Sequence, residues 1–64
     1  MRDPLAATAF LHGLAAVQNL AGRYAEALET AARLMRDAAR FRLTLPIPHG
    51  LMDTAVAQLG LREI

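Results

Sequence analysis

Two histidines and an aspartate are the residues of this chain best suited to metal or acid–base chemistry. His49 and Asp53 lie four residues apart, a spacing that places both side chains on one face of a helix, where they can share a metal ion. No third ligand follows at a matching spacing, so the sequence predicts no metal site. We expect His49 in the first turn of a helix, Asp53 in a local capping or turn role, and His12 on the polar face of an earlier helix.

Covalent catalysis lacks its usual residues here. The chain contains no serine and no cysteine, which are the commonest nucleophiles. Its threonines fall near ordinary helix faces or ends, and its 4 glycines are too dispersed to form a phosphate-binding loop. We therefore expect no enzyme, no catalytic residue and no cofactor.

Positive charge concentrates near the end of one predicted helix, at Arg33, Arg36, Arg40 and Arg42. Such arginines can contact phosphates, so a small nucleic-acid-associated regulator is the alternative function. Acidic residues share this face, and the formal net charge is only +1. We favour a solvated helix end, and we do not expect nucleic acid to be the partner.

Composition favours a small all-α domain. Ala and Leu fill well over a third of the 64 positions and favour helices, whereas Val and Ile, which favour strands, are scarce. A chain of this length buries only about 60% of the surface that its unfolded form exposes, and no disulfide can help, because cysteine is absent. The sequence predicts one module over residues 1–64. The absence of cysteine fits the reducing cytoplasm.

The segment from Pro4 to Gly22 contains no charged residue, which raises the question of a membrane helix. Polar residues and a glycine interrupt the segment, and its apolar content is mostly alanine, whereas a spanning helix needs about 20 predominantly apolar residues. Arg2 and Asp3 cancel in charge where a secretory signal is positive. We expect no membrane partner.

The first helix is predicted over residues 4–21. Asp3 can cap its free amides, Pro4 suits the first helical position, and Gly22 can end it in the left-handed conformation. Two apolar stripes cover it, one of larger and one of small residues: Phe10, Leu14, Val17 and Ala21, and Ala6, Ala9, Gly13 and Ala16. An apolar arc this wide needs neighbours on two sides, and we expect a close helix–helix approach at Gly13.

The second helix, predicted over residues 23–40, is clearly amphipathic. Its charged residues fall within one arc, and the opposite arc is apolar: Tyr24, Ala27, Leu28, Ala31, Leu34, Met35 and Ala38. A turn of one or two residues at Gly22 forces the first two helices into an antiparallel hairpin. We expect the Tyr24 ring to pack between these two helices.

The third helix is predicted over residues 48–59, because Pro46 and Pro48 interrupt the helical period before it. Its apolar face consists of Leu51, Met52, Ala55, Val56 and Leu59. Gly60 is expected to end this helix as Gly22 ends the first. The segments 16–22 and 55–60 are similar, and the repeat period is the spacing between their last residues, Gly22 and Gly60. A period of this length made of helix pairs indicates an α-solenoid.

These features resemble the tetratricopeptide-type (TPR-like) repeat over roughly residues 9–60. The second-helix pattern of that family, Gly-x-Tyr-x-x-Ala followed by a small residue, is matched by Gly22, Tyr24, Ala27 and Ala31, and Leu14 stands where the first helix carries a large residue. Ala15 departs from the family's usual glycine. Degenerate repeats of this kind resemble the helical sensor regions of LuxR-type bacterial transcription regulators, although no DNA-binding or ATP-binding motif of those regulators is present.

The resemblance implies a protein–protein interaction or scaffold module, built as an antiparallel helix hairpin plus a third helix. We expect apolar faces that one hairpin leaves uncovered to form the interaction surface: Ala6, Ala9, Gly13 and Ala16, with Leu51, Met52 and Val56. The partner would be neighbouring repeats, another copy or an amphipathic helix. Because the second repeat lacks its second helix, we expect either a fragment of a larger regulator or a self-associating oligomer.

Overall fold

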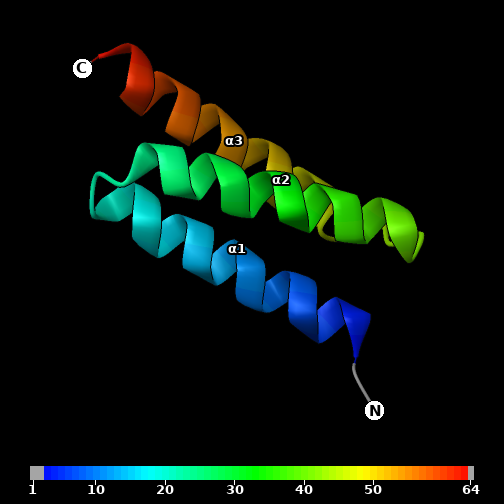
Figure 1. The fold of residues 1–64 in the computed structure, drawn as a ribbon. Helices are drawn as coiled ribbons and strands as arrows, with labels where there is room; N and C mark the ends of the chain where they lie inside the picture. The colour runs from blue at the N-terminus through cyan, green and yellow to red at the C-terminus, as the bar shows by residue number, and fades with distance from the viewer. Residues whose placement is uncertain (1–2, 64) are drawn as a thin grey trace.

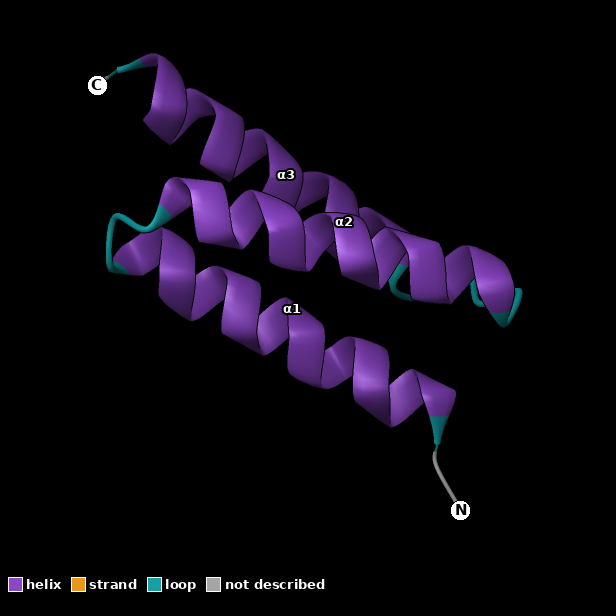
Figure 2. Cartoon of the chain, viewed as in Figure 1, coloured by secondary structure: helices purple, strands orange, loops and turns teal. Residues whose placement is uncertain are grey.

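A computed structural model describes residues 3–63 and contains three α-helices: α1 (Pro4–Leu20), α2 (Tyr24–Arg40) and α3 (Ile47–Arg62). α2 lies between the other two and runs antiparallel to both (Figure 1). Helices account for most of residues 3–63, and none of these residues forms a strand (Figure 2). The predicted all-α class, with a helix hairpin and a third helix, is confirmed. The predicted module of residues 1–64 includes Met1, Arg2 and Ile64, which lie outside the described residues.

The ends of α1 follow the predicted capping rules. Asp3 Oδ1 accepts a hydrogen bond from the Leu5 amide at 3.0 Å, as expected of a helix cap. Gly22 adopts a left-handed φ of 77°, and the Arg23 amide donates to the Gln18 carbonyl at 2.8 Å. This bond closes a Schellman motif, whose left-handed position favours glycine.

α2 ends in the same motif with an unexpected residue. The Leu43 amide donates to the Ala38 carbonyl at 2.8 Å, and Arg42 occupies the left-handed position with a φ of 55°. An L-residue other than glycine is strained in that conformation. Nothing in the sequence pattern had indicated it.

The apolar face of α2 forms the centre of the bundle. Ala27, Ala31, Leu34 and Ala38 are buried, which confirms the predicted face. Thr30 is also buried, and its hydroxyl donates a hydrogen bond to Gln18 Oε1 of α1 at 2.7 Å. Since most of these residues are alanines, the neighbouring helices can approach α2 closely.

The predicted end of α3 at Gly60 is wrong, because the helix continues to Arg62. Gly60 instead lies against the Tyr24 ring, at a place where a side chain would collide with it. The Tyr24 ring, which was expected to pack between the first two helices, therefore contacts α3. Gly50 lies in the same way against Leu34 and Met35. The two glycines let α3 approach α2.

The face that α1 turns inward is the reverse of the one predicted, whereas α3 exposes Leu51, Met52 and Val56 as expected. The inner side of α1 carries Thr8, Leu11, Ala15 and Asn19, and the inner side of α3 carries Gly50, Asp53 and Ala57. The predicted large-residue stripe of α1 faces outward, with Phe10 69% and Val17 62% exposed. No atom lies within 4 Å of the position that a Gly13 side chain would occupy, so the close approach expected there is absent among the described residues.

Hydrogen bonding explains this reversal. A buried polar group is costly only when it lacks a partner. The Thr8 hydroxyl donates to the Leu5 carbonyl at 2.8 Å, and the Asp53 carboxylate and the Asn19 amide nitrogen have partners on other helices, whereas Asn19 Oδ1 has none among the described residues. The periodicity of one helix cannot reveal partners that another helix supplies.

Candidate functional site

A polar cluster joins α1 to α3. His12 Nδ1 lies 2.6 Å from Asp53 Oδ2, and the Asp53 side chain is only 4% exposed. A carboxylate only accepts hydrogen bonds, so His12 Nδ1 carries the hydrogen and donates it. The side-chain amide of Asn19 donates to the Asp53 backbone carbonyl at 3.2 Å. Two residues of α1 therefore hold the same residue of α3.

This geometry corrects the expected role of Asp53, whereas His49 lies in the first turn of α3, as predicted. Asp53 is an interior residue and not a cap, and His12 is half-buried because its ring turns toward α3. His49 stacks on His12, with ring centroids 4.5 Å apart and ring planes inclined by 34°. Sequence reasoning missed the pairing of His12 with Asp53, which lie 41 residues apart. The shared helical face of His12 and Asn19 was the one available signal.

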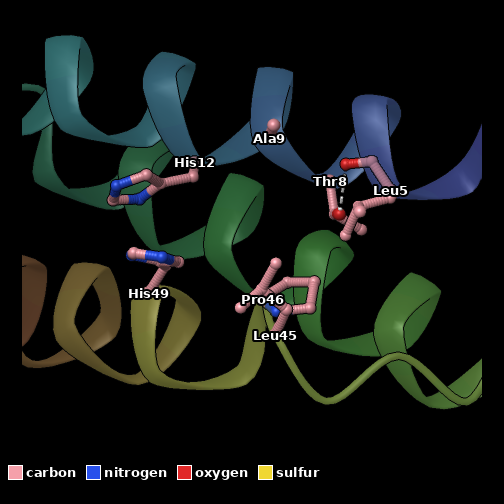
Figure 3. Close-up of a pocket in the computed structure, with 7 residues that line it drawn as sticks. All are labelled: Leu5, Thr8, Ala9, His12, Leu45, Pro46 and His49. Carbon is pink, nitrogen blue, oxygen red and sulfur yellow. Dashed lines mark hydrogen bonds between the residues drawn. The ribbon is translucent and has the colours of Figure 1, made fainter.

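A pocket of about 300 Å³ opens beside the cluster, between the first half of α1 and the start of α3 (Figure 3). Apart from the two imidazoles and the Thr8 hydroxyl, its walls are apolar. They are formed by Leu5, Thr8, Ala9, His12, Leu45, Pro46 and His49. The Thr8 side chain is fully buried, and its hydroxyl is already bonded to the Leu5 carbonyl.

The cluster orients an imidazole but places no activated nucleophile next to it. Among residues 3–63, no group of three or more His, Cys, Asp or Glu side chains is arranged to hold a metal ion. The bonds that the cluster does make all join α1 to α3, the two helices that lie on either side of α2. Its evident role is to fix how these helices sit relative to each other.

Larger surfaces lie on the outward sides of the flanking helices. We define the α1 outer face as Ala6, Phe10, Gly13, Val17 and Leu20, all exposed. We define the α3 outer face as Leu51, Met52, Val56 and Leu59, which are also exposed. Contiguous exposed apolar patches of this kind mark interaction sites in soluble proteins.

The predicted interaction residues fall largely on these two surfaces. Ala6, Ala9 and Gly13 are exposed and Ala16 is half-buried on α1, whereas α3 exposes Leu51, Met52 and Val56. Sequence reasoning missed Phe10 and Val17, because it expected the stripe of larger residues to be covered, and it made no assignment for Leu20, the most exposed member of the α1 outer face. Of the repeat positions, Ala27 and Ala31 are fully buried, Tyr24 is half-buried, and Leu14 is 37% exposed at the rim.

The predicted arginine cluster lies on the charged side of α2 and, with its last member, just beyond the end of that helix. Arg33, Arg36, Arg40 and Arg42 are all exposed. Glu29 lines the same shallow groove as Arg33 and Arg36, so the positive charge there is interrupted by a carboxylate. The Arg40 guanidinium lies over the Phe41 ring, 5.4 Å from its centroid.

In the part of the chain that the structure describes, no helix has the length and apolar character needed to span a membrane. No protein-family model, curated protein or solved structure matches this chain. The geometry described above therefore carries the functional argument.

Proposed function

We propose that this chain is a protein–protein interaction module that docks other helices on the outer faces of α1 and α3. The observation that carries the proposal is the exposure of large apolar side chains, with Phe10 at 69%, Val17 at 62% and Leu20 at 90%. Burying one such side chain contributes about 1.5–3 kcal/mol. A few of them on one face offset the entropic cost of association.

The way the bundle is assembled supports this role. α2 uses its alanine face to hold both neighbours, and apart from Leu11 those neighbours turn small or hydrogen-bonded residues inward. Most of their large apolar residues remain exposed, on the two helices that flank α2 (Figure 1). Helical repeat arrays are built in this manner, with each unit covered by the next.

The proposal includes the TPR-like relationship and, with it, a place in a cytoplasmic regulator of the LuxR type. It is supported by the left-handed Gly22 and by the full burial of Ala27 and Ala31. The alternative, nucleic-acid binding through the arginines of α2, is less favoured because Glu29 shares their groove.

Photo-cross-linking tests the proposal. A photoreactive phenylalanine analogue is placed at Val17, at Val56 or, as the control on the charged face of α2, at Arg33. In cells that make the protein, we expect discrete protein adducts from positions 17 and 56 and none from position 33. Adducts with nucleic acid at position 33, or none at positions 17 and 56, would contradict the proposal.

A salt series separates the two modes of binding. Apolar docking is nearly insensitive to salt, whereas phosphate contacts made by several arginines weaken steeply as salt rises. When lysate is irradiated at increasing salt concentration, the yield of adducts from position 17 should therefore stay nearly constant. Their disappearance at high salt would favour the arginine surface instead.

A further inference from the structure

We propose that a second copy of this chain covers the α1 outer face, with the two α1 helices packed antiparallel. This inference rests on the proposed function and names its partner. The five residues of the face are separated by four, three, four and three positions: Ala6, Phe10, Gly13, Val17 and Leu20. This is the spacing of a coiled-coil seam.

The seam is free to meet a partner. The residues that α1 uses against its own bundle, Thr8, Leu11, Ala15 and Asn19, lie on nearly the opposite side of the helix, since each residue advances about 100°. A helix docked on the α1 outer face therefore approaches from the side away from α2 and α3 and does not collide with them.

One antiparallel register matches large residues to small ones. Placing Phe10 opposite Gly13 of the second copy also places Val17 opposite Ala6 of that copy, because one chain runs forward as the other runs backward. Two-fold symmetry repeats each pair. The position of a Gly13 side chain has no atom within 4 Å, so there is open space over this glycine that a phenylalanine of the second copy can occupy.

Charge also favours a second copy in this orientation. Between Pro4 and Gly22 there is no charged residue to repel its counterpart. Antiparallel packing brings Asp3, at the start of one helix, near Arg23, just beyond the end of the other. The Arg23 side chain is 70% exposed, and its contact with Glu26 is long at 3.6 Å, so it remains free to turn toward Asp3.

Two other arrangements fit less well. In a parallel pair, Phe10 would collide with Phe10 of the second copy and the two Gly13 positions would leave a gap. The two Asp3 carboxylates would repel each other. Docking the α1 outer face on the α3 outer face of another copy is a head-to-tail contact, which builds a ring or an open chain of molecules and not a dimer. The α3 outer face also has no glycine to receive Phe10.

A residue exchange tests the register by sedimentation equilibrium. We expect the unaltered chain to dimerise, and Gly13→Phe and Phe10→Ala each to raise the dimer dissociation constant at least about tenfold, a loss of about 1.4 kcal/mol. The double variant, Phe10→Ala with Gly13→Phe, restores the large–small pairing and should recover most of the affinity. Met52→Asp, on the α3 outer face, should leave the dimer intact.

Folding is checked separately by circular dichroism at a dilution where single chains predominate. Gly13 and Phe10 both lie outside the bundle, so each variant should keep its helices. Failure of the double variant to regain affinity while it remains helical would overturn the proposed register.

Disulfide trapping tests the direction of the helices, since the chain has no cysteine of its own. A mixture of Ala6→Cys and Val17→Cys chains should form a mixed disulfide faster than either chain cross-links with itself. Rapid self-cross-linking of Ala6→Cys alone would show a parallel pair and refute the proposal. A monomeric unaltered chain whose position-17 photoadduct contains a different protein would refute it too, while leaving the proposed function in place.

Discussion

The inner face of α1 carries Thr8, Leu11, Ala15 and Asn19, whereas its outer face carries Phe10, Val17 and Leu20. The inner face is the more polar of the two, although it is the buried one. It holds its place through close packing on the alanines of α2 and through hydrogen bonds to α3. The comparison teaches that α1 leaves most of its large apolar residues exposed, with Leu11 the exception, so that burying them in a contact would be favourable.

The largest expected effect contrasts two leucines of the same helix. Leu11 is 6% exposed and Leu20 is 90% exposed. Leu11→Ala should lower the free energy of unfolding by about 3 kcal/mol, because it opens a cavity, whereas Leu20→Ala should change it by less than about 0.5 kcal/mol. Urea titration of single chains at low concentration measures both. Similar losses of unfolding free energy at positions 11 and 20 would contradict the contrast between the inner and outer faces of α1.

A smaller effect is expected from the hydrogen bond between His12 of α1 and Asp53 of α3. Asp53→Ala removes the acceptor of the His12 hydrogen bond and should lower the free energy of unfolding by about 2 kcal/mol. The His12→Ala, Asp53→Ala double-mutant cycle isolates the pair, and we expect a coupling energy of about 1 kcal/mol. Strict additivity would mean that the 2.6 Å contact contributes nothing.

Two glycines sharpen the contrast between open and packed surfaces. Gly13→Ala should stabilise single chains by about 0.8 kcal/mol, because the site is empty and alanine favours helix. Gly60→Ala makes the same exchange within α3, yet it should destabilise by about 1 kcal/mol, because the new methyl group meets the Tyr24 ring. Opposite signs in thermal unfolding are the expected result, and equal signs would contradict the packing described.

The smallest effect is expected at the end of α2. Arg42→Gly should raise the free energy of unfolding by about 0.5 kcal/mol, because glycine relieves the left-handed strain but has more freedom in the unfolded chain. Arg40→Gly, two residues earlier and inside the helix, is the matched control and should lose about 1 kcal/mol. A loss at position 42 would mean that its side chain stabilises the turn.

The fold was predictable where the residues of a single helix determine its bounds and its buried face. The separation of charged and apolar arcs identified α2 and its buried face, and the capping residues Asp3 and Gly22 located the ends of α1. The orientations of α1 and α3 were not predictable in this way. They depend on Asp53 meeting His12 and on Gly60 meeting Tyr24, contacts between segments distant in the sequence.

The candidate site was predictable to a similar degree. The small residues Ala6, Ala9 and Gly13 and the α3 residues Leu51, Met52 and Val56 were placed correctly on exposed surfaces. Phe10 and Val17 were not, because a periodicity argument sends large apolar residues inward. That rule fails when a helix has two apolar sides and its own bundle covers only one of them.

Thiol labelling of dilute single chains tests the reversed orientation of α1 most directly. Thr8→Cys and Val17→Cys each introduce one thiol of nearly unchanged size into a chain that has none. Thr8 is fully buried and Val17 is 62% exposed, so the thiol at position 17 should react at close to its rate in the unfolded chain, and the thiol at position 8 at least about a hundredfold more slowly, as expected when reaction requires opening of the fold. A protected thiol at position 17 together with a reactive one at position 8 would contradict the account.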